Sequence, residues 1–264
     1  MDGQNRVART RISDDFGAAA SHYDSAARLQ QAVGARLMDF MGADPGGRGL
    51  DLGCGTGYFL PLLSRSLQPG ELIAADLSPG MIDYARRERD LASEWYVADA
   101  EALPLDDASL DWVFSSLMIQ WCDDTNAVFR EALRVLRPGG EAVFSTLVQG
   151  TLGELEAAWA EADPGGRHVN RFLTLEELKA ALDDAAVPSP VEVEPMVLWY
   201  PDLMALLKEL KTLGARYKDE TRRRSAMAPA RLRALGQAYE RFRQGDRGVP
   251  ATWQVAYVRL HRPE

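Results

Sequence analysis

Residues 50–58 carry three glycines at alternate positions, and this short run constrains the fold more than any other part of the chain. The run reads LDLGCGTGY, so apolar residues and one aspartate, Asp51, lead directly into Gly53, Gly55 and Gly57. Glycine allows left-handed backbone conformations and lets a ligand touch the main chain where no side chain intervenes. The run therefore predicts a buried strand that turns sharply into a helix, with a ligand-binding loop between them.

The spacing of the glycines separates two kinds of nucleotide-binding loop. A dinucleotide-binding loop has the pattern Gly-x-Gly-x-x-Gly, which here would require a third glycine at position 58. That position is Tyr58, near which the helix is expected to begin. A nicotinamide- or flavin-dependent oxidoreductase is therefore the lowest-ranked hypothesis for the function.

Short β-like runs alternate with longer helical ones between residues 49 and 147. This alternation is typical of an α/β fold with a mostly parallel sheet and helices on both faces. The expected strands, including two beyond residue 150, are Gly49–Leu52, Glu71–Asp76, Glu94–Ala98, Leu110–Ser115, Gly140–Leu147, Val191–Trp199 and Thr252–Leu260. The expected helices are one or two within Ser13–Phe40, then Pro79–Arg89, Thr125–Leu136, Gly153–Ala162, Thr174–Asp184, Asp202–Leu213 and Pro229–Phe242.

Two local signals set boundaries within this pattern. The hydroxyl of Ser78 is expected to cap the helix that begins with Pro79 at its first position. The run Arg-Pro-Gly-Gly at residues 137–140 is expected to separate a helix from the fifth strand.

The order of these elements divides the chain into three parts. We expect residues 1–45 to form an N-terminal helical cap, residues 46–150 the binding core, and residues 151–264 a C-terminal part of the same domain. Because β-rich segments flank residues 202–243, we expect the helices there to form a lid that is inserted between the last two strands and covers the ligand site.

The composition indicates the compartment of the protein and excludes some classes of partner. Two cysteines without paired spacing and thirty N-terminal residues without a signal-peptide core favour a cytoplasmic protein. No stretch approaches the roughly 20 apolar residues that cross a bilayer, so no membrane partner is expected. The formal net charge of −9 argues against nucleic acid as a partner, because binding it requires a basic surface. The three histidines lack the spacing of metal ligands, so no metal is expected.

Acidic residues end the second and third expected strands. Asp76 follows the glycine loop by about twenty residues, where a carboxylate can accept hydrogen bonds from ribose hydroxyls. Asp99, followed by Ala100, ends the third strand. The glycine spacing, the preceding Asp51 and these two strand ends together resemble the class I S-adenosylmethionine-dependent methyltransferases.

This resemblance implies S-adenosylmethionine as the cofactor and a Rossmann-like sheet with an antiparallel last strand. Asp51 would orient the ammonium of the methionine portion, Asp76 would hold the ribose and Asp99 the adenine. The other implied cofactor-binding residues are the glycines beside the methionine portion and those near the adenine, namely Gly53, Gly55, Gly57, Leu77, Met81 and Ala100.

A narrower resemblance covers about residues 16–260. The segments that carry it are FGAAASHYD (16–24), SSLMIQWC (115–122), FSTLVQG (144–150), NRFL (170–173) and KELKTLGA (208–215). They are similar to the malonyl-acyl-carrier-protein O-methyltransferases of biotin synthesis. The resemblance implies methyl transfer to the free carboxylate of a malonyl thioester. Since that carboxylate is ionised at pH 7, the reaction needs no general base.

The same resemblance indicates residues on the acceptor side, namely Tyr23, Gln120, Trp121, Gln149 and Arg171. Arg171 is the first candidate to bind the malonyl carboxylate, because a guanidinium matches its two oxygens; alternatively it caps the next helix or lies on the surface. Tyr23 would donate its hydroxyl to the cofactor carboxylate, or it packs as an ordinary helical aromatic. Trp121 walls the substrate pocket or fills the core.

The implied partner is malonyl-acyl carrier protein, and carrier proteins of this kind are acidic. Between residues 208 and 247, twelve basic residues outnumber five acidic ones, and we expect Arg222, Arg223 and Arg224 to dock the carrier. A solvated helix face explains the same charges. Methylation of another small acid or of a quinone ring carbon stays open, as does a non-catalytic protein that binds the cofactor.

Overall fold

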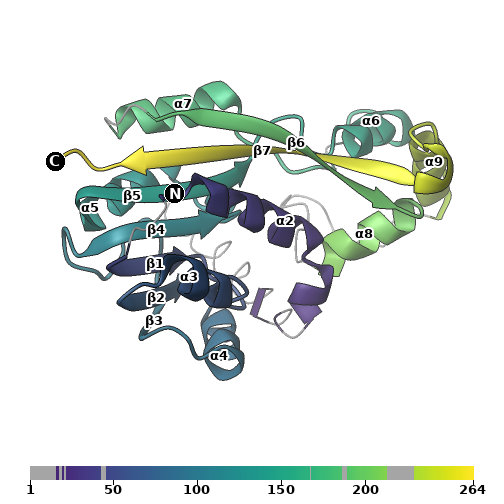
Figure 1. Ribbon diagram of the computed structural model, residues 1–264. Helices are drawn as coiled ribbons and strands as arrows, with labels where there is room; N and C mark the ends of the chain where they lie inside the picture. The colour runs from purple at the N-terminus through teal and green to yellow at the C-terminus, as the bar shows by residue number, and fades with distance from the viewer. Residues whose placement is uncertain are drawn as a thin grey trace.

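The computed structural model describes residues 16, 17, 20, 22–42, 46–166, 168–185, 189–212 and 229–264. Within these residues a seven-stranded sheet forms the centre, in the order β3-β2-β1-β4-β5-β7-β6 (Figure 1). The strands are β1 (Arg48–Leu52), β2 (Glu71–Asp76), β3 (Glu94–Val97), β4 (Leu110–Ser116), β5 (Leu136–Leu147), β6 (Val191–Tyr200) and β7 (Val249–His261).

The direction of the strands confirms the expected fold class. All paired strands run parallel except at β7, which pairs antiparallel with both β5 and β6. The order of strands reverses at β1, because the chain builds β2 and β3 on one side of it and β4 on the other. Ligands of such sheets bind in the crevice beyond the carboxyl ends of the strands at this reversal point.

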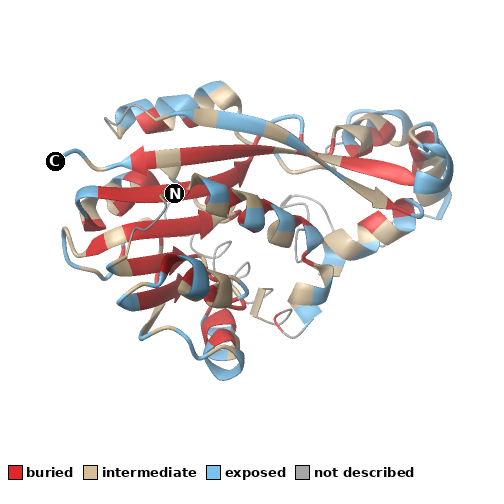
Figure 2. Ribbon diagram, viewed as in Figure 1, coloured by how far each residue is buried: buried red, intermediate tan, exposed pale blue. Residues whose placement is uncertain are grey.

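Helices cover both faces of the sheet. One cluster of buried side chains joins α2 (Arg28–Leu37) and α3 (Leu60–Leu67) to one face, and a second joins α5 (Thr125–Val135) and α7 (Leu175–Asp184) to the other. Successive residues of β4 belong to different clusters because side chains alternate across a strand. Figure 2 shows the central strands buried almost throughout. The remaining helices are η1 (Met38–Phe40), α4 (Pro79–Glu88), η2 (Ile119–Trp121), α6 (Gly153–Ala162), α8 (Leu203–Thr212), α9 (Pro229–Glu240) and η3 (Gly245–Arg247).

The Arg-Pro-Gly-Gly run lies inside β5 and does not precede it. The strand begins at Leu136, directly after α5, and its register against β4 shifts between Leu110 and Trp112. Residues 137–139 are exposed at this shift. The run therefore bends the strand as a bulge, where the sequence indicated a turn before it.

The expected hydroxyl cap of α4 is wrong. Ser78 is the N-cap residue, but its side chain makes no capping hydrogen bond. Its backbone N–H donates instead to Asp76 Oδ1 at 2.8 Å, so the start of α4 is fixed by the carboxylate that ends β2.

The far ends of β6 and β7 extend past the other strands and carry the C-terminal helices (Figure 1). There α8 and α9 lie between β6 and β7 in the chain. Arg241, directly after α9, forms an ion pair with Glu161 of α6 at 2.8 Å. Glu209 of α8 pairs with Arg28 at 2.9 Å, so this end of the sheet is also connected to α2. None of the described helices is both long and apolar enough to span a membrane.

The close contact between β1 and β4 generates a stability prediction. A Cβ added at Gly49 would lie 2.0 Å from the indole ring of the fully buried Trp112, whose Nε1 donates to Gly46 O at 2.9 Å. Gly49→Ala should therefore lower the free energy of unfolding by about 2–3 kcal/mol through overpacking. Equilibrium unfolding in urea measures this change in the free energy of unfolding, provided that its dependence on urea concentration has the same slope in both proteins.

Gly236 in α9 provides the matched control. A Cβ at this position would meet nothing within 4 Å. Gly236→Ala should raise the free energy of unfolding by about 0.5–1 kcal/mol, because alanine loses less backbone entropy in a helix. Equal effects of the two substitutions would contradict the packing argument.

Candidate functional site

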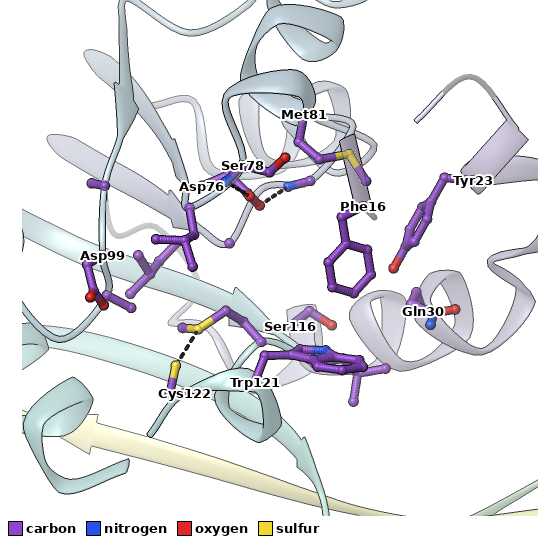
Figure 3. A pocket seen from close by; sticks show the side chains of 18 residues that line it. Phe16, Tyr23, Gln30, Asp76, Ser78, Met81, Asp99, Ser116, Trp121 and Cys122 are labelled. Atoms are coloured by element: carbon purple, nitrogen blue, oxygen red, sulfur yellow. Dashed lines mark hydrogen bonds between the residues drawn. The ribbon is translucent and has the colours of Figure 1, made fainter. Parts of the chain in front are cut away.

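A cavity lies beyond the carboxyl ends of the central strands, at the reversal point of the sheet. Its walls come from the glycine loop after β1, the ends of β2 and β3, the segment after β4, and the N-terminal helical residues (Figure 3). The described lining residues are Phe16, Tyr23, Gln30, Leu52, Gly53, Gly55, Asp76, Leu77, Ser78, Met81, Ala98, Asp99, Ala100, Ser116, Leu117, Met118, Trp121 and Cys122. The cavity therefore joins segments that are far apart in the chain.

The three glycines of the loop do different work. Gly53 has φ +75°, and a Cβ there would lie 2.5 Å from Met118 Cγ, so this position requires the absence of a side chain. Gly55 has φ +53°, and a Cβ there would meet nothing within 4 Å, which leaves its backbone open to a ligand. Gly57 faces Leu60 and Ala85, so it permits close packing behind the loop and does not line the cavity.

Asp76 connects the loop to the end of β2. Its side chain accepts hydrogen bonds from the backbone N–H of Gly55 at 2.9 Å and of Ser78 at 2.8 Å. Burial raises the pKa of the Asp76 carboxyl, although the two amide donors lower it. This buried carboxyl thus lines the cavity while its position is fixed by backbone amides from two segments.

Asp51 lies deeper, beside a second cavity that shares Tyr23, Gln30, Gly53, Gly55 and Ser116 with the first. The residue is 3% exposed, and its Oδ2 has no hydrogen-bond partner. Burial, followed by the charge of Asp76, raises the pKa of Asp51 to about 8. A buried carboxyl oxygen without a donor costs free energy, so this atom is available to a ligand that donates hydrogen bonds.

The N-terminal residues form the wall opposite the strand ends. Phe16 makes edge contacts with Tyr23 and Trp121, with ring centroids 6.1 and 5.1 Å apart (Figure 3). Tyr23 borders both cavities, and burial followed by the charges of Asp76 and Asp24 raises its pKa. The wall is therefore largely aromatic.

Gln30 of α2 also borders both cavities, and its Oε1 is buried without a partner. The sequence analysis missed Phe16 and Gln30 as lining residues. Phe16 stood within the family-like N-terminal run, which was a usable signal, whereas Gln30 is one polar residue among several on a helix.

The four residues expected near an adenine ring also belong to the wall of this cavity. Leu77, Met81, Asp99 and Ala100 all line it. Asp99 Oδ1 accepts the backbone N–H of Glu101 at 2.9 Å, which orders the loop after β3. The expectation also missed apolar neighbours on this side, namely Leu52, Ala98, Met118 and Cys122.

The acceptor-side candidates are brought together only in part. Trp121 lines the cavity, but Gln120 does not; its amide donates to Leu117 O at 2.6 Å, and its Oε1 accepts from Thr146 at 3.2 Å. Gln149 is exposed, and its backbone N–H donates to Leu173 O at 2.8 Å. Gln120 and Gln149 thus support the loops beside the cavity in this structure.

Arg171 is not among the described residues that line the cavity. Its side chain is 68% exposed and forms an ion pair with Glu177, the residue whose carboxylate closes the capping box of α7. Among the described residues, no group of three His, Cys, Asp or Glu side chains is placed to hold a metal ion.

The raised pKa of Asp51 predicts a pH dependence whose sign is fixed. Below about pH 8 the folded protein without ligand keeps the proton on Asp51, whereas the unfolded chain loses it near the ordinary value of 3.8, so this group lowers stability as pH rises between them. A ligand ammonium requires the ionised carboxylate. The Kd for S-adenosylhomocysteine, the demethylated product of the expected cofactor, should therefore fall up to about tenfold per unit as pH rises from about 6 toward 8.

Calorimetry in buffers of different ionisation enthalpy measures both the Kd and the proton released on binding. The increase in affinity should level off near pH 8, where the ligand's own ammonium begins to titrate. Asp51→Asn should bind more weakly and without this slope. A wild-type Kd that stays constant across the range, with no proton release, would contradict the assignment of Asp51.

Comparison with known proteins agrees with this geometry. Residues 50–144 match a family model described as a methyltransferase domain. The chain is 42% identical to the malonyl-[acyl-carrier protein] O-methyltransferase of Serratia marcescens over 256 residues, which is 97% of each chain. It is 41% identical to the biotin biosynthesis bifunctional protein BioHC of Cellvibrio japonicus, with 97% of this chain matching 51% of that one.

A solved structure extends the likeness to the fold. The crystal structure of a putative methyltransferase from Bacillus halodurans superposes with a TM-score of 0.62 at 14% identity, covering 88% of this chain and 100% of that chain. At that identity the likeness concerns the fold alone. Given 42% identity over 97% of both chains, the protein belongs to the malonyl-[acyl-carrier protein] O-methyltransferase family.

Proposed function

We propose that this protein transfers a methyl group from S-adenosylmethionine to the free carboxylate of a malonyl thioester on acyl carrier protein, as a step of biotin synthesis. Family membership supports the reaction and the acceptor. The structural observation that best supports cofactor binding is the buried carboxyl oxygen of Asp51, which lies beside the glycine loop and has no hydrogen-bond partner. It provides an acceptor for the ammonium of an amino-acid ligand in a cavity that shares lining residues with the one bordered by Asp76, the sugar-binding candidate.

The residues present fit the cofactor. Asp51 Oδ2 and Gln30 Oε1 are two buried acceptors without partners, and both residues line the second cavity, where they suit the hydrogens of an ammonium. The open backbone at Gly55 suits close approach of the methionine portion. Asp76 would hold the ribose and Asp99 the adenine amino group. The ring of the base would lie among Leu77, Met81 and Ala100, which are mostly apolar neighbours in the cavity.

S-adenosylmethionine supplies an electrophilic methyl group on its sulfonium, and the carbon–sulfur bond breaks as the carbon–oxygen bond of the ester forms. The protein's part is to position the acceptor and exclude water. A malonyl carboxylate is already ionised at pH 7, so no side chain has to remove a proton. The aromatic wall of Phe16, Tyr23 and Trp121 provides a dry surface on the acceptor side.

The acceptor carboxylate still needs a cationic donor, and Arg171 keeps that role in our proposal. In the structure its guanidinium is occupied by Glu177, so it would exchange this partner for the malonyl carboxylate. The neighbouring Gln149 backbone is bonded to Leu173, which ties the Arg171 segment to the loop after β5. Gln120 acts by holding the loop at Leu117, whose φ is +51°.

The carrier protein would dock on the basic part of the lid, residues 202–243. Arg222, Arg223 and Arg224, the proposed contacts, lie outside the described residues. Acidic carriers are attracted to a local excess of positive charge even on an anionic protein, and such steering acts mainly on association. The proposal assigns the lid both docking and closure of the cavity.

A rival acceptor is a quinone ring carbon, whose methylation requires a base to remove a proton. No histidine is among the described residues that line the cavity, which favours a carboxylate acceptor. A non-catalytic cofactor-binding protein would share every cofactor contact, and turnover distinguishes it.

Purified protein incubated with methyl-labelled cofactor and malonyl-carrier protein, malonyl-coenzyme A or malonate tests the reaction. We expect base-labile label on the malonyl thioesters, with the carrier-bound substrate used at the highest kcat/KM. Succinyl-carrier protein serves as the matched acceptor control. Absence of label on every malonyl compound would refute the acceptor while leaving cofactor binding intact.

Docking on the arginine triplet is tested by reversing its charges, Arg222→Glu, Arg223→Glu and Arg224→Glu together. The KM for malonyl-carrier protein should rise about tenfold or more, because long-range attraction becomes repulsion. The KM for a small malonyl thioester should change less than about twofold, since it makes no contact with the carrier surface. Equal increases for both substrates would remove the docking proposal.

A further inference from the structure

Asp24, next to Tyr23 in the N-terminal helical segment, makes two side-chain contacts with the opposite side of the cofactor site. Its Oδ1 accepts the hydroxyl of Thr56 at 2.6 Å, and Thr56 lies between the second and third glycines of the loop. Its Oδ2 forms an ion pair with Arg89, the C-cap residue of α4. Arg89 completes the triangle by donating to Thr56 O at 2.6 Å.

These contacts connect three segments that are far apart in the sequence, namely the N-terminal helical segment, the glycine loop and the end of α4. Thr56 is 2% exposed, and the side chains of Asp24 and Arg89 are 26% and 22% exposed. Gln31 of α2 adds a hydrogen bond from its Nε2 to Asp24 O at 2.8 Å. The network is therefore partly shielded from water, where a charge-assisted hydrogen bond is stronger than on an open surface.

The same N-terminal segment touches α4 at a second point. A Cβ added at Gly80 would lie 2.9 Å from the Cα of Gly17, so the two backbones are in close contact at the start of α4. Gly17 thus contacts the start of α4, and Asp24 is paired with the residue that ends it. Phe16 and Tyr23, the chain neighbours of these two residues, form one wall of the cavity.

We propose that Asp24, Thr56 and Arg89 form a latch that holds the N-terminal wall against the glycine loop, and that they are positioning residues for cofactor binding. The inference rests on the proposed use of S-adenosylmethionine at this site. The latch residues bind one another and not the cofactor. They therefore act indirectly, by holding Tyr23, Gln30 and the glycine loop in place.

The opposite charges of Asp24 and Arg89 predict that removing one of them weakens cofactor binding more than removing the other. Asp24 acts electrostatically on Tyr23, which borders both cavities together with Asp51. With Arg89 present, the charge of Asp24 is neutralised. Without it, an unpaired carboxylate would lie beside the cavities and repel the carboxylate of the cofactor's methionine portion. Loss of Arg89 should therefore do more harm than loss of the Asp24 charge.

Calorimetry with S-adenosylhomocysteine measures this order of effects in the full-length protein. Arg89→Met should raise the Kd about tenfold and Asp24→Asn about threefold, since the asparagine can still accept from Thr56. The double variant Arg89→Met with Asp24→Asn should bind better than Arg89→Met alone, because it no longer carries the unpaired carboxylate. Arg89→Lys should recover part of the lost affinity.

Arg87→Met is the matched control. Arg87 lies two residues away on α4, is 65% exposed and pairs with its neighbour Glu88. This variant should bind S-adenosylhomocysteine as the wild type does. A Kd for Arg89→Met equal to that of Arg87→Met would overturn the latch, as would a double variant that binds more weakly than either single one, which would indicate general loosening.

Hydrogen exchange provides a readout without any ligand. Backbone amides of residues 22–31 should exchange faster in Arg89→Met than in Arg87→Met, while those of β4 and β5 stay unchanged. Equal exchange of residues 22–31 in the two variants would overturn the latch. A wild-type protein that fails to bind S-adenosylhomocysteine would instead overturn the proposed function, and hydrogen exchange would still decide whether the pair holds the segment.

Discussion

The site depends on one partly buried carboxyl group, that of Asp76, which accepts hydrogen bonds from the backbone amides of Gly55 and Ser78. These two bonds set the distance between the glycine loop after β1 and the start of α4 after β2. The loop is also fixed from behind, where the amides of Gly53 and Cys54 both donate to Ala75 O, at 2.8 and 3.0 Å. A ligand therefore meets a preorganised strand edge, and little conformational entropy has to be lost when it binds.

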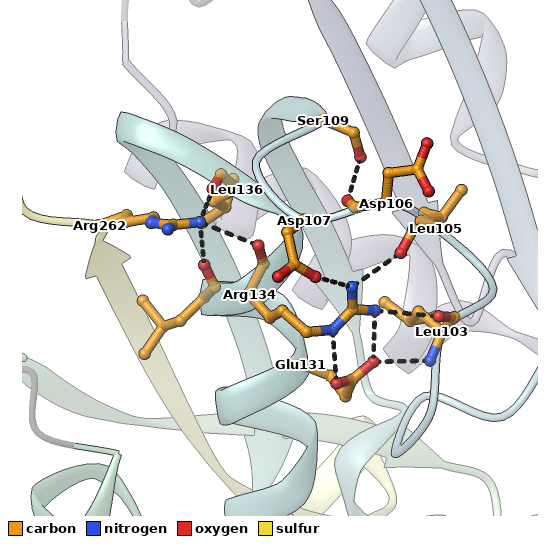
Figure 4. A network of polar contacts seen from close by, with 10 residues as sticks. Leu103, Leu105, Asp106, Asp107, Ser109, Glu131, Arg134, Leu136 and Arg262 are labelled. Atoms are coloured by element: carbon orange, nitrogen blue, oxygen red, sulfur yellow. Dashed lines mark hydrogen bonds and ion pairs between the residues drawn. The ribbon is translucent and has the colours of Figure 1, made fainter.

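Two buried polar atoms beside the cavities have no hydrogen-bond partner in the protein. Asp51 Oδ2 and Gln30 Oε1 lack partners although both are buried, a condition that costs stability in the ligand-free protein. Outside the site, carboxylates of similar burial are paired; Glu141, for example, binds Arg259 and the amide of Gly42. Figure 4 shows the same principle on the opposite side of the sheet, where Arg134 is bonded to Glu131, Asp107 and two backbone carbonyls. The contrast between Asp51 and Glu141 therefore favours Asp51 as the carboxyl that a ligand would satisfy.

The sequence predicted the parts of this site that depend on local pattern. Strands that end in Asp76 and Asp99 could be placed because the carboxyl ends of parallel strands share one edge. Gln30 and the Asp24–Arg89 pair could not, because no periodicity distinguishes a helix residue that faces a cavity from one that faces solvent or sheet. For Arg171 a local signal was present in the sequence but was not used. Glu177, at the third position of α7, completes a capping box and also pairs with the Arg171 guanidinium. The family resemblance was given more weight than this signal.

A crystal structure of the protein with S-adenosylhomocysteine tests the central claim most directly. We expect ribose hydroxyls within hydrogen-bonding distance of the Asp76 carboxylate, the ammonium between Asp51 and Gln30, and the base between Leu77 and Asp99. Asp76 should keep its bonds to the amides of Gly55 and Ser78 in that complex. A ligand bound elsewhere, or an Asp76 side chain that leaves the two amides to admit the ribose, would contradict it.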